Sequence, residues 1–111
     1  MDDCIFCKII NKEIPCNKVY EDDAFIVFHD IHPKAKVHVL VVPKTHIVSL
    51  NELQTHDQPM LGQLMLLLPT IAAQLGLNNG FRTVINTGKE GGQEVNHLHV
   101  HILGGRLMLF K

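Results

Sequence analysis

The run NHLHVHILGG, residues 96–105, alternates histidine with aliphatic residues. Alternation of this kind predicts a β-strand, because residues two apart share one face of a strand and stand about 6.5–7 Å apart along it. The histidines on one face are His97, His99 and His101, and the aliphatic residues behind them are Leu98, Val100 and Ile102. We therefore expect a strand over residues 97–103 that turns one face to a site and the other to the core.

Patterns outside this run predict an α+β domain built on one antiparallel sheet. A short helix is expected over residues 4–11 and a long helix over 57–75. The remaining strands are expected over 18–23, 24–30, 36–43 and 81–86, with an acidic turn joining the first two. Short turns between strands favour antiparallel pairing, and we expect both helices to lie on one side of the sheet.

The long helix carries more apolar residues than one sheet can cover. Its main stripe recurs at three- and four-residue steps and consists of Leu61, Leu64, Leu68, Ile71 and Leu75. Asp57 is expected to cap this helix with Pro59 just inside it, and Gly76 to end it. Pro69 should bend it. The apolar residues off the stripe are Met60, Met65, Leu66 and Leu67, and they predict contact with a second subunit.

Composition indicates a single globular domain over residues 1–111 and excludes several functions. Hydrophobic residues make up 46% of the chain and the formal net charge is −1. Without a basic stripe, nucleic acid is not an expected partner. No signal sequence is recognisable, and Gln63, Pro69 and Gln74 interrupt the longest apolar tract, so no membrane span is expected. A cytoplasmic location follows by elimination.

Three interpretations of the histidine row compete. The histidines could be ordinary hydrogen-bonded residues, or they could chelate zinc, since histidines two apart on a strand can do so. The strand carries no acidic residue to complete a hydrolytic metal centre. In the third, a neutral imidazole attacks phosphorus and leaves readily once protonated. The preceding glycine-rich loop, residues 87–94, favours the third, because Gly88, Gly91 and Gly92 let backbone N–H groups approach a phosphate.

The segment GGQEVNHLHVHILGG, residues 91–105, closely resembles the signature of the histidine triad family. Further similarity lies in CIFCKIINKEIP (4–15), FHDIHPKAKVHVLVVPKTHI (28–47) and LGLNNGFRTVINTGKEGGQ (75–93), which resemble the Hint-type branch of purine nucleoside phosphoramidases. The resemblance implies a HIT-like fold with a five-stranded antiparallel sheet, one long helix and one short helix. It also implies a homodimer in which two sheets join into a continuous ten-stranded sheet.

The resemblance implies a role for each histidine. His99 would attack the α-phosphorus of an adenosine or guanosine 5′-phosphoramidate and form a nucleotidyl-histidine, which water then hydrolyses. His101 and His38 would bind a phosphate oxygen or help the amine leave. His97 would orient the central ring.

The resemblance also implies a nucleotide site. Asp30 would accept hydrogen bonds from both ribose hydroxyls. The phosphate contacts implied are Asn86, Gly92, Gln93 and Glu94, and the purine slot implied is Ile5, Phe6, Ile9, Phe28, Ile31 and Leu40. Without the resemblance, Asp30 reads more simply as a turn residue, and part of the apolar set is also core.

Two features depart from the best-known pattern of the branch. Glu94 stands where serine is common, and an ionised carboxylate cannot donate a hydrogen bond to the leaving nitrogen. Its backbone is therefore expected to contribute more than its side chain. The tail RLMLFK, residues 106–111, is short, which leaves substrate preference and dimer contacts open.

A second candidate site begins at Cys4 and Cys7, a CxxC pair. In a reducing compartment such a pair is more often a metal clip or redox pair than a disulfide. By resemblance to members of the family that carry this motif, the other ligands would be His46 and His97, and the four would hold a structural zinc. The alternative is two ordinary half-buried cysteines, and Cys16 is expected to be structural.

Purine nucleotides are thus the expected substrates, and no organic cofactor is expected. Two alternatives to the phosphoramidase remain open: a dinucleoside polyphosphate hydrolase, as in the fragile-histidine branch, and a nucleotide-binding module whose catalysis is incidental.

Overall fold

The computed structural model describes residues 4–107 of the chain. Its elements in chain order are α1 (Ile5–Ile10), β1 (Lys18–Glu21), β2 (Phe25–His29), β3 (Ala35–Pro43), η1 (Leu50–Glu52), η2 (Thr55–Asp57), α2 (Gln58–Gln74), β4 (Phe81–Val84) and β5 (Val100–Leu107). The expectations for the ends of the 1–111 domain, including the last four residues of the tail, fall outside the described residues.

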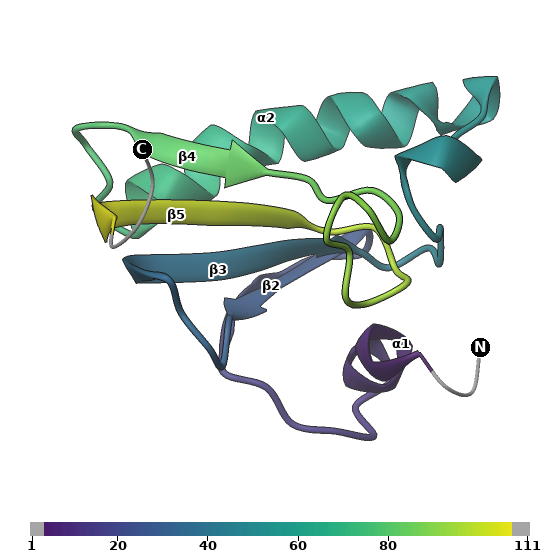
Figure 1. Ribbon diagram of the computed structural model, residues 1–111, viewed down its shortest axis with the longest axis horizontal. Helices are drawn as coiled ribbons and strands as arrows, with labels where there is room; N and C mark the ends of the chain where they lie inside the picture. Colours follow the sequence, from purple (N-terminus) through teal and green to yellow (C-terminus); the bar gives the residue numbers. More distant parts are fainter. Residues whose placement is uncertain (1–3, 108–111) are drawn as a thin grey trace.

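The five strands form one antiparallel sheet in the order β1-β2-β3-β5-β4 (Figure 1). The two central strands are β3 and β5, and their register pairs His38 with Leu103 and Leu40 with His101. The predicted α+β class with five antiparallel strands, one long helix and one short helix is therefore confirmed. This register brings His38 of β3 next to His101 of β5.

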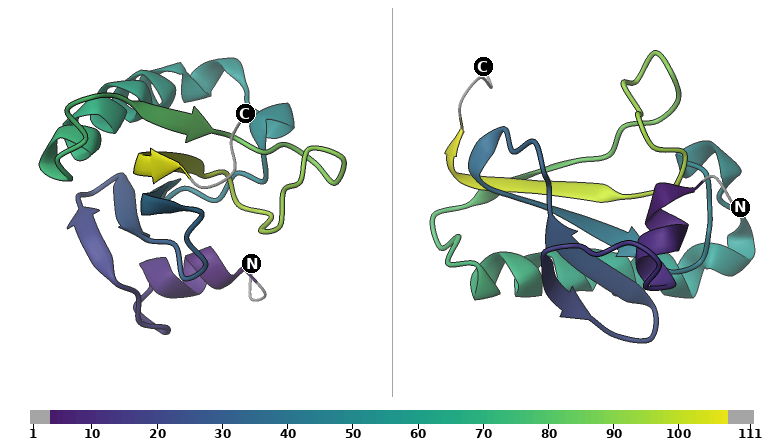
Figure 2. Two further views of the ribbon diagram at one scale, coloured as in Figure 1. Left: turned by 60° about the vertical axis from the view of Figure 1, so that its left-hand side comes forward. Right: turned by 90° about the horizontal axis from the view of Figure 1, so that it is seen from below.

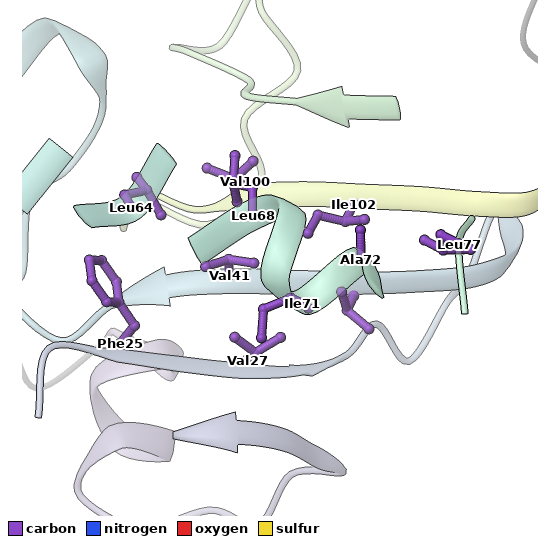
Figure 3. Packing of buried hydrophobic residues seen from close by; sticks show 11 residues of the cluster. Phe25, Val27, Val41, Leu64, Leu68, Ile71, Ala72, Leu77, Val100 and Ile102 are labelled. Atoms are coloured by element: carbon purple, nitrogen blue, oxygen red, sulfur yellow. The ribbon is translucent and has the colours of Figure 1, made fainter. Parts of the chain in front are cut away.

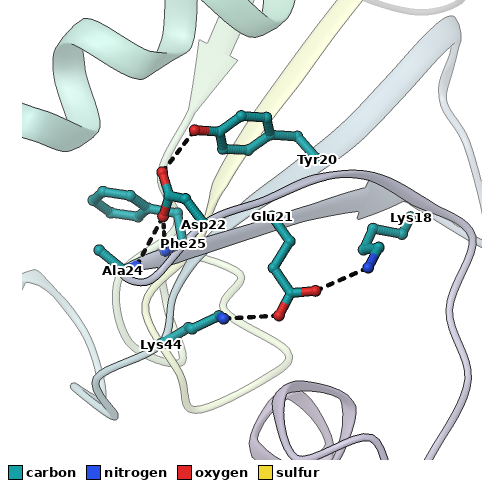
Figure 4. Close-up of polar contacts among 7 residues, drawn as sticks. All are labelled: Lys18, Tyr20, Glu21, Asp22, Ala24, Phe25 and Lys44. Carbon is teal, nitrogen blue, oxygen red and sulfur yellow. Dashed lines mark hydrogen bonds and ion pairs between the residues drawn. The ribbon is translucent and has the colours of Figure 1, made fainter.

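The predicted acidic turn joins β1 to β2 (Figure 4). One carboxylate oxygen of Asp22 accepts hydrogen bonds from the backbone N–H groups of Ala24 and Phe25, both at 2.8 Å. The other accepts the hydroxyl of Tyr20 at 2.7 Å. An aspartate that bonds the backbone two residues ahead closes a tight turn, which explains how so short a connection reverses the chain.

The helix α2 covers one face of the sheet with the predicted apolar stripe (Figure 3). Leu64 and Ile71 are 1% and 0% exposed, and they pack in one cluster with residues of all the inner strands. The strand residues of that cluster are Phe25, Val27, Val39, Val41, Val100 and Ile102. Truncating one such leucine to alanine typically costs about 2–5 kcal/mol, so this layer holds β3 and β5 in place.

The expectation that both helices share one side of the sheet is wrong. Figures 1 and 2 show α1 on the face opposite α2. Phe6 and Ile9 of α1 pack there in a second buried cluster with Ile26, Phe28, Leu40 and Val42. The physical reason is that β2 is apolar at four successive positions, Phe25–Phe28, so both of its faces need cover.

The last strand starts later and ends later than expected. Its first residue is Val100 rather than His97, because the backbone N–H groups just before it are bonded elsewhere. The N–H of His97 donates to the carbonyl of Val95, and that of Leu98 donates to the carbonyl of Ile47. This departure from the sheet frees the histidine segment to bend toward α1.

The ends of α2 agree with expectation in two respects of three. Pro59 lies in the first turn, and Gly76 follows the helix with a φ of +78°, a conformation that favours glycine. The side chain of Asp57 does not cap α2; it accepts a hydrogen bond from the backbone N–H of Gln54 at 2.9 Å and so closes η2 instead.

The apolar residues outside the stripe divide into two groups. Met60 and Leu67 pack against the core, whereas Met65 and Leu66 are 48% and 75% exposed. Within residues 4–107, none of the helices has the length and hydropathy needed to cross a membrane.

Candidate active site and metal cluster

Three histidines gather where β3 meets β5. The ring centroid of His101 lies 5.0 Å from that of His99 and 5.2 Å from that of His38. The side chains of His38 and His99 are almost fully buried. A buried imidazole needs a hydrogen-bond partner for each ring nitrogen or a ligand to take its place, so the partners decide what each ring can do.

The partner of His99 fixes which of its nitrogens is bare. Its Nδ1 lies 2.7 Å from the carbonyl oxygen of His97. A carbonyl only accepts, so Nδ1 must carry the hydrogen, and in the neutral ring Nε2 keeps its lone pair. Burial lowers the pKa of His99, which keeps the ring neutral near pH 7. His99 is therefore a neutral imidazole with a free Nε2.

A second chain of hydrogen bonds fixes His38 and His101. The backbone N–H of Lys34 donates to Nδ1 of His38 at 3.0 Å, so the hydrogen of neutral His38 is on Nε2. That Nε2 lies 2.9 Å from Nδ1 of His101 and 3.4 Å from a carboxylate oxygen of Asp30. Since Nδ1 of His101 accepts the shorter bond, its Nε2 carries a hydrogen that it can donate.

The pKa of His101 falls to about 4, chiefly through burial and then through the charges of His99 and His38. The Asp30 carboxylate opposes this shift. Burial likewise lowers the pKa of His38, again against the pull of Asp30. The histidines of this site are therefore neutral near pH 7.

The histidines open into a pocket of about 560 Å³ between α1, the sheet and the glycine-rich loop. A volume of this order suits a ligand of nucleotide size. The residues predicted for catalysis or nucleotide contact that line it are Ile5, Phe6, Ile9, Phe28, Asp30, Ile31, His38, Leu40, Asn86, Gly92, Glu94, His99 and His101. Two predicted residues, Gln93 and His97, do not line it.

Side chains hold the glycine-rich loop in shape. Asn86 donates its amide to the carbonyl of Gly91 at 2.8 Å. Gln93 accepts the backbone N–H of Gly88 at 2.9 Å and donates to the carbonyls of Val48 and Val95 at 2.6 and 3.0 Å. The side chain of Gln93 thus holds the loop in place by hydrogen bonds and does not line the pocket. Gly92, at φ +82°, adopts a conformation that a side chain would strain.

Sequence reasoning missed several residues that shape the site. Lys34, whose N–H fixes His38, also lines the pocket, as do Cys16, Asn17 and Val95. Lys34 stands four residues before His38, but nothing in the sequence shows that the chain turns back to bond that ring. Cys16 reads from sequence as a structural cysteine, and its place at the pocket wall carries no sequence signal.

The second predicted site is assembled beside the first. Nδ1 of His97 lies 3.3 Å from Sγ of Cys4 and 3.6 Å from Sγ of Cys7. Nδ1 of His46 lies 3.2 Å from Sγ of Cys7 and 3.1 Å from Nδ1 of His97. All four donor atoms lie within 4.8 Å of one another and could hold one metal ion. Two thiolates and two imidazoles form a donor set that zinc binds in tetrahedral structural sites.

The hydrogen bonds around this cluster suit a cation. Nε2 of His97 donates to the carbonyl of Pro43 at 2.7 Å, which leaves Nδ1 bare and facing the thiols. Sγ of Cys4 accepts the backbone N–H of Cys7 at 3.2 Å, which fixes the position of this sulfur beside Cys7. Burial and then the neighbouring Cys4 raise the pKa of Cys7 to about 11, and a bound cation would offset both effects.

Asp30, His38 and His101 form another group spaced closely enough for a metal. The hydrogen bonds oppose that use. Nδ1 of His38 already accepts the N–H of Lys34, so its Nε2 holds a hydrogen where a metal would need a lone pair. We therefore assign the metal-binding capacity to the cluster of Cys4, Cys7, His46 and His97, called the metal cluster below.

Fold and site together define a class: a small α+β protein with a pocket that is lined by histidines and bordered by a glycine-rich loop. Comparison with known proteins narrows it. A family model described as the HIT domain matches residues 11–108, and the chain belongs to the HIT family.

Among curated proteins, protein HitA of Neisseria gonorrhoeae is 56% identical over 104 residues, which are 94% of this chain and 97% of that protein. Among solved structures, a HIT family hydrolase from Legionella pneumophila matches with a TM-score of 0.93 at 41% identity, covering 97% of both chains. A histidine triad nucleotide-binding protein from Candida albicans matches at 0.82 and 33%, covering 90% of this chain and 73% of that one.

The metal cluster predicts that the purified protein binds one zinc ion per chain. A Cys4→Ala, Cys7→Ala double variant should lose that zinc, because two of the four donors are gone. Metal analysis after dialysis against metal-free buffer measures it, and Cys16→Ala is the matched control that should keep the full equivalent. Zinc retained by the double variant, or a second equivalent held by the wild type, would contradict the assignment.

The buried histidines predict that acid destabilises the fold. His101 takes up its proton at about pH 4 when folded and near pH 6.5 when unfolded, so between these values the unfolded chain binds more protons. The free energy of unfolding should fall as the pH drops from 7 to 4. Denaturant titrations across this range should give a shallower slope for His101→Asn than for wild type. The control His56→Asn, whose side chain is 77% exposed, should keep the wild-type slope; equal slopes for all three proteins would refute the role of His101.

Proposed function

We propose that this protein is a purine nucleoside phosphoramidase. It would cleave the P–N bond of adenosine or guanosine 5′-phosphoramidates through a covalent nucleotidyl intermediate on His99. In aminoacyl-adenylates the same attack would break the P–O bond of the acyl phosphate and release the amino acid as its carboxylate. The observation that carries the proposal is the neutral His99 ring with its Nε2 bare in a pocket of about 560 Å³. The description of a relative as a hydrolase and of another as nucleotide-binding supports it.

In the first step, Nε2 of His99 attacks the α-phosphorus and the P–N bond breaks. The attacking ring becomes positively charged as the new bond forms. Its Nδ1–H remains bonded to the carbonyl of His97, and the charge of Asp30 favours the cationic ring. Both interactions strengthen as the positive charge develops on the ring. They therefore stabilise the transition state more than the bound substrate, which lowers the barrier.

The departing nitrogen needs a proton, and His101 is placed to stabilise that nitrogen as it leaves. Its Nε2 holds a hydrogen because its Nδ1 accepts from His38, so the neutral ring can donate a hydrogen bond to the departing nitrogen. The proton that the amine carries away comes from solvent water, and the water that attacks in the second step releases one in return. Water then attacks the nucleotidyl-His99, the P–N bond to the ring breaks, and the nucleoside monophosphate leaves. The neutral imidazole is restored with Nδ1 protonated.

The nucleoside would occupy the apolar end of the pocket. We assign the purine to Ile5, Phe6, Ile9, Phe28, Ile31 and Leu40, and the ribose hydroxyls to Asp30. Oδ1 of Asp30 accepts the N–H of His32 at 2.8 Å, which fixes the carboxylate at the pocket wall. The phosphate would meet Asn86, Gly92 and Glu94, with Gln93 acting through the loop that it braces. His97 would orient His99 through its carbonyl rather than its ring.

The surroundings of the site complete the proposal. We assign zinc to the metal cluster. A reducing compartment such as the cytoplasm would keep its cysteines reduced and so able to bind the ion.

We also propose a homodimer joined along β4, an edge strand of the sheet, because Phe81 of β4 and Leu66 of α2 are exposed apolar side chains. Sedimentation equilibrium giving the mass of one chain would contradict the dimer.

Turnover of a fluorogenic adenosine 5′-phosphoramidate tests the function. Replacing the nucleophile removes the covalent route, so His99→Ala should lose activity by about 1,000-fold or more. The matched control, His56→Ala, removes an exposed histidine and should keep wild-type turnover. Faster hydrolysis of a diadenosine polyphosphate run in parallel would favour the polyphosphate hydrolase. Binding of AMP without turnover of either substrate would favour the binding module.

A further inference from the structure

Two sites that look separate share the segment His97–His99. The ring of His97 turns its Nδ1 to the metal cluster, while the carbonyl of the same residue accepts the Nδ1–H of His99. The adjacent Leu98 N–H is tied to Ile47, the residue after His46. A change at the metal cluster can therefore reach the hydrogen bond that sets His99 through one residue, His97, whose ring is held by the carbonyl of Pro43.

The short helix α1 is the second shared element. It and its cap provide Cys4 and Cys7 to the metal cluster, and the same helix provides Ile5, Phe6 and Ile9 to the pocket wall. A helix of six residues is too short to be stable alone. Its position depends on its tertiary contacts, which are the cysteines at its start and the packing of Phe6 and Ile9.

Phe6 joins the two sites directly. Its ring meets His99 edge-on at 5.1 Å between centroids and His97 at 5.9 Å, and it meets Phe28 of the pocket wall at 5.5 Å. The side chain is 5% exposed, so it has little room to move independently of these rings. Cys7, which follows it in the chain, faces His46 and His97.

From these contacts we propose that metal binding and nucleotide binding are thermodynamically coupled, with Phe6 as the positioning residue between them. A metal ion that draws Cys4, Cys7, His46 and His97 together fixes α1 and hence one wall of the pocket. The nucleotide then meets a wall that is already ordered and binds more tightly. Coupling is reciprocal, so the nucleotide must raise the affinity for the metal by the same factor.

This inference rests on the proposed function for the choice of ligand, and AMP, the product of that reaction, is the probe. Isothermal titration calorimetry should give a lower Kd for AMP with the zinc-loaded protein than with protein stripped by a chelator, by a factor of about 5–150. Competition with a chromophoric chelator should show that saturating AMP lowers the Kd for zinc by the same factor.

Amide hydrogen exchange should show that zinc removal speeds exchange in residues 5–10 while β3 keeps its protection, which establishes that the stripped protein stays folded.

Variants separate coupling from general damage. Phe6→Leu keeps an apolar side chain but loses the ring contacts, so it should still bind zinc and AMP with a coupling factor close to 1. The control Val84→Ala alters the pocket on β4, away from α1, and should keep the wild-type factor even where AMP affinity changes. Cys4→Ser with Cys7→Ser should bind AMP as weakly as stripped wild type, with no response to zinc.

Each outcome has one meaning. Equal factors for zinc and AMP in wild type, lost in Phe6→Leu, support the coupling. Tight binding of both ligands with a factor of 1 in wild type overturns it and leaves the proposed function intact. Zinc binding without AMP binding to any form overturns the proposed function instead, and absence of zinc binding removes the metal cluster and the coupling together.

Discussion

The hydrogen bond from Nδ1–H of His99 to the carbonyl of His97, at 2.7 Å, is the constraint on which the site depends. This hydrogen bond selects the tautomer of His99 that leaves Nε2 without a hydrogen. It does so reliably, because a backbone carbonyl can only accept a hydrogen bond. The same peptide segment leaves the sheet just before β5, where Leu98 N–H bonds Ile47. A fully regular strand would direct that carbonyl into the ladder, so the irregular start of β5 is what leaves the carbonyl available to His99.

The sheet supports this geometry because both of its faces are buried. The cluster under α2 fixes β3 and β5 as a rigid pair, and the smaller cluster under α1 forms the pocket side. His38 and His101 meet across the β3–β5 register, so their contact is set by the backbone ladder. Burial also lowers the pKa of these rings, and the sheet thus controls both where the imidazoles are and how readily they accept protons.

Much of the fold and of the site's composition could be predicted from the sequence. The stripe of α2 and the acidic turn are local patterns that specify their structures. The alternation around His99 predicted a strand from His97, whereas β5 begins at Val100. The four members of the metal cluster also converge as the family resemblance implied. The structure places α1 on the other face of the sheet from the one predicted, because Phe25–Phe28, apolar throughout, require cover on both sides.

The tautomers could not be predicted, because they depend on partners far away in sequence or on backbone direction. The carbonyl that fixes His97 belongs to Pro43, 54 positions earlier. Nitrogen-15 NMR of the imidazole rings tests the central claim most directly. The account predicts that in free protein near pH 7 His99 is neutral with its hydrogen on Nδ1; a neutral ring with the hydrogen on Nε2, or an imidazolium, would contradict it.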